Sequence, residues 1–402
     1  MIRRWIQRCQ YRFNSGAVRV GEDLVQLEDV ARRRVTTPYS DKYYQPIIRQ
    51  GFQGFDRLIL PKDFYAGNQE IDIEDESSHL QQKELEEIVK SFDADVKVSI
   101  GYGSGVFPQI GYENDVEQTQ IDFINIVDNV DKFHKANLFQ HPQHYSVRIP
   151  LLIRIIQGKN GIYFNPFIRI RKKLIKYGII LTRASLVDLS EWSSLYFAGR
   201  MQKPVNFIKD DEPMVKFLNQ YNLKNAMTLL ILLIESAEFS ERELYEQITR
   251  ISYLGDFRMY IGGENPNKVR NIVEKQFPRF KKLYDPILHY FIQRNCLVIV
   301  SNNNNDKTFR KNLTISNKIK LISTLPLQFR SKLYRMYQEK SIKEIVNDKN
   351  LSRNLTTIVS RTIQISSIMQ TVRGIFSAGI FKSIKYAFAK QLKFWKGKRY
   401  ST

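Results

Sequence analysis

The chain has 402 residues and a net charge of +21, and 43% of its residues are apolar. This length and apolar content allow two or three folded domains, and the charge predicts an anionic partner: nucleic acid, anionic lipid or nucleotide phosphates. Cys9 and Cys296 are the only cysteines, which excludes a disulfide framework and indicates a reducing compartment. Because the longest conspicuous apolar run covers only residues 229–234, we expect any membrane contact to be peripheral.

The N-terminus has the composition of a targeting segment. Residues 1–21 contain five arginines and no acidic residue, and Ile2, Trp5, Ile6 and Cys9 share one helical face. A basic amphipathic start without acids is typical of a mitochondrial transit peptide, which we assign to residues 1–20. A disordered basic tail is the alternative interpretation.

A glycine-rich turn between two apolar segments is the most informative motif. Glycines at positions 101, 103 and 105 follow a strand-like run, and residues 121–127 form a second run that carries Asp122. Glycine amides approach a phosphate closely, Ser104 adds a hydroxyl donor, and a strand carboxylate binds the Mg²⁺ that accompanies phosphates. The pattern resembles nucleotidyltransferases of the DNA polymerase β type. A glycine hairpin with an isolated aspartate is the alternative.

Two positions compete for the metal-binding acid. Enzymes of this type place two acids, separated by one residue, about 9 to 13 residues after the Gly-Ser pair. Asp115 and Glu117 have that spacing but lie in a polar stretch, whereas Asp122 lies in a strand with an apolar residue at the partner position. We therefore assign Mg²⁺ to Asp122. Asp188 and Asp256 are the candidates for the second acid, and each serves equally well as a helix cap or an ion-pair partner.

The hydrophobic pattern predicts a sheet followed by helices, and therefore an α+β protein. Short helices are expected between the strand-like runs, so the sheet should be mixed. The period becomes helical from Leu186, a boundary is expected at residues 210–213, and residues 214–290 predict successive helices with a capping box at 240–243. Residues 301–306 are rich in asparagine and predict a surface loop. The strand-like runs cover residues 96–100, 121–127, 147–150, 161–164 and 173–180.

The C-terminal segment, residues 371–402, contains no acidic residue. Its apolar residues recur at helical spacing from Ile380 to Trp395, and lysines occupy another face. A basic amphipathic helix with aromatic residues on its apolar side favours an anionic membrane surface. A helix packed on the protein body is the alternative. The predicted membrane contacts are Phe381, Ile384, Lys385, Phe388, Lys393 and Trp395.

Seven motifs in one order carry a family resemblance. The ordered set closely resembles the mitochondrial translocator assembly and maintenance protein family, which are mitochondrial phosphatidate cytidylyltransferases (CDP-diacylglycerol synthases). The resemblance extends from about Tyr43 to the C-terminal helix. The motifs are Tyr102–Gln109, Ile121–Ile124, His144–Ser146, Tyr163–Pro166, Ile175–Gly178, Leu195–Pro204 and Ile251–Met259.

This resemblance implies a domain plan and a reaction. A polymerase β-type nucleotidyltransferase domain is expected over residues 40–210, a winged-helix-like domain over 211–300, a helical region over 301–370 and the membrane-binding helix over 371–402. CMP would pass from CTP to phosphatidic acid with Mg²⁺ as cofactor, for cardiolipin and phosphatidylglycerol synthesis. The enzyme would be a peripheral protein on the matrix side of the mitochondrial inner membrane, bound to its anionic surface and not to nucleic acid.

The resemblance also assigns functional residues. Asp122, Lys176 and Ser104 are the predicted catalytic residues, although Lys176 also suits a solvated position. His144 also suits a core position, Asn165 a turn, and the glycine-rich connection around Arg258 and Lys268 an ordinary turn. The predicted nucleotide- and phosphate-binding residues are Tyr102, Gly103, Ser104, Gly105, His144, Asn165, Tyr177, Arg258 and Lys268.

Two other functions share some of these features. An RNA nucleotidyltransferase would have the same catalytic fold and a basic surface, but the sequence has no aromatic-interleaved RNA-binding motif and ends in a membrane-type helix. A non-catalytic inner-membrane assembly factor is the other alternative. The glycine turn with Asp122 favours catalysis over it.

Overall fold

The computed structural model describes most of the chain from residue 67 to residue 379. Several predictions lie outside the described residues: the transit peptide at 1–20, Ser104, the acids Asp115 and Glu117, Arg258, and the membrane contacts from Phe381 to Trp395. The described ranges are 67–71, 76–103, 105–107, 120–171, 173–256, 267–303, 306–338 and 340–379.

Among the described residues, five strands form a mixed sheet in the order β3-β4-β2-β1-β5. β2 and β4 run parallel, and the other neighbouring pairs run antiparallel. The sequence prediction of an α+β protein with a mixed sheet is therefore confirmed. The strands are β1 (Val98–Tyr102), β2 (Ile121–Val127), β3 (Tyr163–Ile170), β4 (Lys173–Leu181) and β5 (Asn206–Asp210).

Within this five-stranded sheet, one predicted strand is wrong and one observed strand was not predicted. The run at residues 147–150 is not a strand, because helix α6 (Pro150–Gln157) begins at Pro150. Proline favours the first position of a helix, where its missing N–H is not needed. The fifth strand is β5, which pairs with β1 at the edge of the sheet. It has five residues and lies between two segments whose apolar residues recur at helical spacing, so the sequence pattern did not predict it.

The two faces of the sheet pack against different helices. Odd-numbered residues such as Phe123 and Tyr177 pack with α4 (Glu76–Lys90) and α5 (Val130–Gln140). Even-numbered residues such as Ile124 and Ile180 pack with α7 (Thr182–Glu191), α8 (Ala198–Met201) and α9 (Met214–Leu233). Because side chains alternate along a strand, Asp122 and Lys176 belong to the face that the second set covers.

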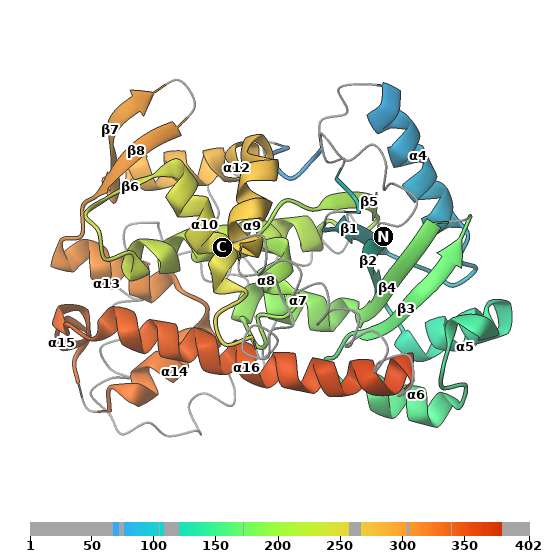
Figure 1. Ribbon diagram of the computed structural model, residues 1–402. Helices are drawn as coiled ribbons and strands as arrows, with labels where there is room; N and C mark the ends of the chain where they lie inside the picture. The colour runs from blue at the N-terminus through green and yellow to red at the C-terminus, as the bar shows by residue number, and fades with distance from the viewer. Residues whose placement is uncertain are drawn as a thin grey trace, which may run out of the picture.

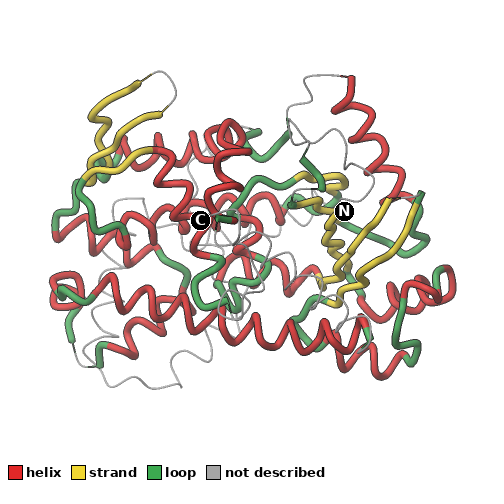
Figure 2. Tube along the Cα trace, in the orientation of Figure 1, coloured by secondary structure: helices red, strands yellow, loops and turns green. Residues whose placement is uncertain are grey.

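The described part of the chain from α9 to β8 contains three helices and a small sheet. Helices α9, α10 (Glu241–Ile251) and α12 (Lys268–Gln293) confirm the predicted helical run, and the Ser240 hydroxyl accepts a hydrogen bond from the Glu243 amide (3.1 Å) at the start of α10. The strands β6 (Glu238–Ser240), β7 (Leu297–Asn303) and β8 (Asp306–Lys311) pair in the order β6-β8-β7. Figure 2 shows the two groups of strands at opposite ends of the molecule, with helices between them.

The asparagine-rich stretch was predicted wrongly as a loop. β7 continues past residue 300 to Asn303, and β8 begins at Asp306, so most of the predicted loop belongs to a hairpin. Polar side chains suit strands at the protein surface, which is why composition alone indicated a loop.

A long C-terminal helix spans both ends of the molecule. After α13 (Ile315–Thr324), α14 (Leu327–Met336) and α15 (Ile342–Asn347), helix α16 (Leu351–Ala378) runs from the neighbourhood of α15 to that of α6 (Figure 1). Its Ser352 hydroxyl donates to the Leu233 carbonyl (3.1 Å) and its Gln370 amide to the Ile162 carbonyl (2.5 Å). Residues 371–378 continue α16, so the predicted division at residue 371 falls inside a helix.

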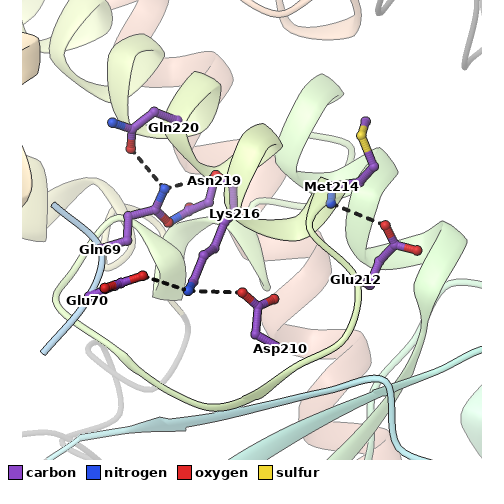
Figure 3. Close-up of polar contacts among 8 residues, drawn as sticks. All are labelled: Gln69, Glu70, Asp210, Glu212, Met214, Lys216, Asn219 and Gln220. Atoms are coloured by element: carbon purple, nitrogen blue, oxygen red, sulfur yellow. Dashed lines mark hydrogen bonds and ion pairs between the residues drawn. The ribbon is translucent and has the colours of Figure 1, made fainter. Parts of the chain in front are cut away.

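Polar contacts also join the sheet to α9 where the boundary at 210–213 was predicted. Lys216 of α9 forms ion pairs with Asp210 at the end of β5 (2.9 Å) and with Glu70 (3.6 Å) (Figure 3). Gln69 donates to the Gln220 side chain (2.9 Å) in the same view. Polar side-chain contacts therefore join the two sides of the predicted boundary. In the part of the chain that the structure describes, no helix combines the length and apolar character needed to span a membrane.

Gly255→Ala tests how closely α16 packs on the helical region. Gly255 has φ +77°, and a Cβ there would collide with the Ser360 carbonyl oxygen of α16. We expect the free energy of unfolding to fall by about 2 kcal/mol or more in urea titrations. Gly374→Ala is the control, because a Cβ at Gly374 meets no atom within 4 Å; alanine there should stabilise α16 by up to about 1 kcal/mol. Equal stability of the two variants would contradict the close packing.

Candidate active site

An acidic side chain and a basic side chain lie side by side on adjacent strands. In the parallel register of β2 and β4, Asp122 is paired with Lys176. The Lys176 Nζ lies 3.5 Å from the Asp122 Oδ1 and 4.6 Å from the ring centroid of Phe164. The two charged side chains are 31% and 28% exposed, so a ligand can still reach them. The structure thus brings together the predicted metal-binding acid and the predicted catalytic lysine.

The glycine turn adjoins this acid. β1 ends at Tyr102, and Gly103 adopts φ +81°, which glycine accepts without strain. A Cβ on Gly103 would lie 3.6 Å from the Asp122 Oδ2, and a Cβ on Gly105 would clash with the Gln120 carbonyl just before β2. Two glycines therefore let the turn pack against the start of β2, beside Asp122.

Tyr102 and two residues of a later loop complete the group. The Arg200 guanidinium lies 3.8 Å from the ring centroid of Tyr196 and 5.7 Å from that of Tyr102. The Tyr102 hydroxyl is buried without a hydrogen-bond partner among the described residues. Burial raises its pKa, and the positive charge of Lys176 partly opposes that rise. Tyr102 is therefore a neutral hydroxyl at physiological pH, able to donate to an anion.

The pKa of Lys176 reflects the same neighbours. Burial alone would lower it, but attraction to Asp122, and further to Tyr102 and Tyr196, outweighs that effect and raises the pKa. Lys176 is therefore protonated throughout the physiological range. It acts as a fixed positive charge and not as a proton acceptor.

A second cationic group lies on the far side of Arg200. The Lys203 ammonium donates to the Gly199 carbonyl (2.5 Å) and to the Ser252 hydroxyl (2.7 Å). Both Lys203 (5.7 Å) and Lys268 (5.5 Å) lie over the ring of Tyr253. Burial, and then the nearby charges of Arg200 and Lys268, lower the pKa of Lys203 well below its ordinary value. Closely spaced cations of this kind favour an anionic ligand.

Asp188 holds the loop that contains Tyr196 and leads into α8, which carries Arg200. Its Oδ1 accepts hydrogen bonds from the Ser193 and Ser194 hydroxyls and from the Ser194 and Leu195 amides, at 2.7–3.0 Å. Its Oδ2 accepts from the Phe197 and Ala198 amides, both at 2.9 Å. All six donors belong to residues 193–198 of the same chain. The predicted metal-binding role of Asp188 is therefore not supported, since both oxygens already serve as a loop cap.

Asp256 also bonds to its own chain. It is buried, and its Oδ1 accepts from the Ser367 hydroxyl of α16 (3.3 Å). Among the described residues, no three His, Cys, Asp or Glu side chains gather as a metal site. Asp122 is different, because its Oδ1 is buried and accepts no hydrogen bond from the described residues. The Lys176 ammonium faces this oxygen at 3.5 Å, and a carboxylate in that position suits Mg²⁺ that takes its other ligands from phosphates and water.

Three predicted nucleotide-binding residues lie on the opposite face of the sheet. The Tyr177 hydroxyl contacts His144 Nδ1 (2.9 Å) and accepts from the Asn137 amide (2.8 Å). Asn165 is fully buried and pairs with Tyr177 in the β3–β4 register. Burial, and then the neighbouring His141, lower the pKa of His144 to about 4. Strand alternation turns Asn165 and Tyr177 away from Asp122, and His144 lies beside the Tyr177 hydroxyl, so the structure does not bring these three predicted nucleotide-binding residues together with the Asp122–Lys176 pair.

Comparison with known proteins gives the family. A family model described as mitochondrial phosphatidate cytidylyltransferase matches residues 85–393. The chain belongs to this family. A protein of that name from Saccharomyces cerevisiae is 38% identical over 382 residues, which cover 93% of this chain and 83% of the relative. The Schizosaccharomyces pombe relative is 35% identical (81% and 86% covered), and the Mus musculus relative is 33% identical (78% and 95% covered).

Sequence reasoning missed Tyr196, Arg200 and Lys203 as site residues. All three lie in the motif Leu195–Pro204, which contributed to the family resemblance without any role being assigned to it. The signal was the pairing of aromatic and cationic residues four apart, Tyr196 with Arg200, which brings them together on one helical turn. What the motif alone did not show is that this turn faces β1 and β4.

Asp188→Asn separates the capping role from a metal-binding role. An asparagine amide would present N–H groups to N–H donors, so at least two of the six bonds would be lost in a buried place. We expect the free energy of unfolding to fall by about 2–4 kcal/mol, measured in urea. Asp131→Asn, at an exposed position of α5, is the control and should change it by about 0.5 kcal/mol or less. Unchanged stability with a shifted Mg²⁺ requirement would restore the metal-binding interpretation.

Proposed function

We propose that this protein is a phosphatidate cytidylyltransferase, which makes CDP-diacylglycerol and pyrophosphate from CTP and phosphatidic acid. The observation that carries the proposal is the Asp122–Lys176 pair beside the Gly103 turn, in a chain of this family. The product would serve cardiolipin and phosphatidylglycerol synthesis in mitochondria.

The reaction requires stabilisation of negative charge and does not require a strong base. The attacking group is a phosphate oxygen of phosphatidic acid, which is already ionised at neutral pH, and it must approach the α-phosphorus of CTP although both reactants are polyanions. Fixed cations and amide donors lower that repulsion as negative charge shifts to the leaving pyrophosphate. Lys176 and Arg200 are suited to this work, because Lys176 lies over Phe164 beside Asp122 and Arg200 lies over Tyr196 near Tyr102.

Asp122 is the residue that we propose to hold Mg²⁺, with Ser104 and the amides of the Gly103–Gly105 turn on the phosphates. When bound, the ion would neutralise part of the charge on the triphosphate. Lys203 and Lys268 would contribute at the edge of the same site, and Arg258 remains a prediction.

The domain assignments are proposals supported by topology. The mixed sheet with a glycine turn between β1 and β2 suits a polymerase β-type nucleotidyltransferase domain. In the second region, the order α9-β6-α10-α12-β7-β8 with the strand order β6-β8-β7 suits a winged helix. The hairpin extends that domain to Lys311.

We also propose that the protein acts peripherally at the matrix side of the inner mitochondrial membrane. The arginine-rich residues 1–20 support mitochondrial import, and the acid-free residues 380–402 support adsorption to anionic lipid. An RNA nucleotidyltransferase is the alternative that an assay can exclude directly.

Asp122→Asn should reduce turnover to less than a tenth of the wild-type rate. The substitution removes the proposed anionic Mg²⁺ ligand at nearly constant volume. The assay uses labelled CTP, Mg²⁺ and phosphatidate liposomes, with RNA in a parallel tube. Asp128→Asn, at an exposed position directly after β2, is the control and should keep full activity. Retained activity of Asp122→Asn would move the metal site, and labelling of RNA alone would refute the lipid substrate.

Removal of residues 380–402 should release the protein from liposomes rich in anionic lipid and leave CTP binding intact. The cut is placed after Gly379 because α16 runs to Ala378, whose carbonyl accepts from the Ser146 hydroxyl (2.8 Å). Each lysine near an anionic surface contributes about 1 kcal/mol, so adsorption should weaken in high salt. Flotation of full-length and shortened protein at low and high salt measures this. Equal flotation would mean that the membrane contact lies elsewhere.

A further inference from the structure

A second site adjoins the candidate active site. A pocket of about 480 Å³ lies between α7, α14 and α16, next to the loop 193–197. Nothing in the mechanism above uses it. Its volume lies within the range of small-molecule sites, and its lining divides into a cationic part and an apolar part. We call it the α14–α16 pocket.

The cationic part comes from α14 and α16. Lys332 and Arg335 of α14 and Arg361 and Arg373 of α16 all line the pocket. Asp188 is the one acid in the lining, and its oxygens accept the six hydrogen bonds from its own loop. The charge that faces the pocket is therefore positive.

The apolar part lies at the rim. Met336, Ile365 and Met369 line the pocket and are 42%, 67% and 49% exposed. Three large apolar side chains on two adjacent helices, exposed beside four cations, match neither a purely ionic phosphate site nor an ordinary protein surface. This combination suits an anionic amphiphile.

The pocket is continuous with the candidate active site through Tyr196. This tyrosine lines the pocket, and the Arg200 guanidinium of the active site lies 3.8 Å from its ring centroid and 5.7 Å from that of Tyr102. Ile180 in the pocket lining lies on β4, on the same face as Lys176 and four residues further along, or about 13 Å. A ligand in the pocket thus lies within a lipid's length of the Asp122–Lys176 pair.

We propose that the α14–α16 pocket binds the lipid substrate of this enzyme, with acyl chains against Met336, Ile365 and Met369 and the phosphate drawn along the cationic wall toward Tyr196. The proposal rests on the proposed function, because it takes phosphatidic acid as the amphiphile. It adds the surface through which that lipid reaches the catalytic residues.

Arg361→Glu tests the cationic wall, and Arg353→Glu is its matched control. Both arginines are exposed on α16, eight residues apart, and only Arg361 lines the pocket. With short-chain phosphatidic acid below its micelle concentration, we expect Arg361→Glu to raise the KM for lipid about tenfold or more and to leave the KM for CTP unchanged. Arg353→Glu should change neither. Equal lipid KM values for the two variants, or a rise in the KM for CTP, would overturn the proposal.

Ile365→Ser and Ile368→Ser test the apolar rim in the same way. Both are exposed on α16, but only Ile365 lines the pocket. Equilibrium binding of short-chain phosphatidic acid to the full-length protein without CTP should weaken about threefold or more for Ile365→Ser alone. Inorganic phosphate should not compete at equal concentration; if it does, the pocket is a phosphate site and not a lipid site.

These two readouts separate the failure of the inference from that of the proposed function. Wild-type protein that binds short-chain phosphatidic acid through Arg361 but makes no CDP-diacylglycerol would refute the function and keep the pocket. Wild-type protein that makes CDP-diacylglycerol with the Arg361 and Arg353 variants equal would refute the pocket and keep the function. Thermal unfolding of all four variants at the wild-type temperature confirms that each is folded.

Discussion

The parallel pairing of β2 with β4 is the constraint on which the candidate site depends. Its register sets Asp122 opposite Lys176, and a parallel pair requires a long crossover, here residues 128–172 with α5, α6 and β3. An ion pair that is about a third exposed adds little to stability, on the order of 1 kcal/mol or less. Its position is therefore better explained by the ligand that it would meet than by folding.

Each cation of the site lies over an aromatic ring, and Lys176 also faces the Asp122 carboxylate at 3.5 Å. Lys176 lies over Phe164, Arg200 over Tyr196, and both Lys203 and Lys268 over Tyr253. An aromatic face attracts a cation without cancelling its charge, as a carboxylate would. Positive charges can therefore stand close together and still act on a phosphate, which is what a reaction between two polyanions requires.

The helices beyond the sheet position one side of this site. Asp188 caps the loop in which Leu195 adopts φ +54°, a costly conformation for a residue other than glycine, and so fixes Tyr196 and Arg200 in front of β1. α16 lies beside that loop and contributes Arg361 and Arg373 to the cationic part of the α14–α16 pocket. The long C-terminal helix thus joins the sheet, the helical region and the proposed lipid site, although the sequence pattern divided it at residue 371.

The sequence by itself determined the composition of the site and most of its elements. The glycine turn, the strand carrying Asp122, Lys176 on a second strand and the helices after residue 213 could be read from periodicity and turn chemistry, because those are local properties. Short or atypical elements escaped this reading: β5 has five residues between two helical segments, and the hairpin of β7 and β8 has a polar, asparagine-rich tip.

Only the tertiary structure decided which residues share the site. Asn165 and Tyr177 belong to the predicted motifs but face the opposite side of the sheet, because a one-residue step along a strand reverses the side chain, and His144 contacts the Tyr177 hydroxyl on that side. Arg200 and Tyr196 are distant in sequence but lie beside Tyr102 because the Asp188 cap folds their loop back onto the sheet. Local pattern specifies elements, whereas register and long-range packing choose the faces that meet.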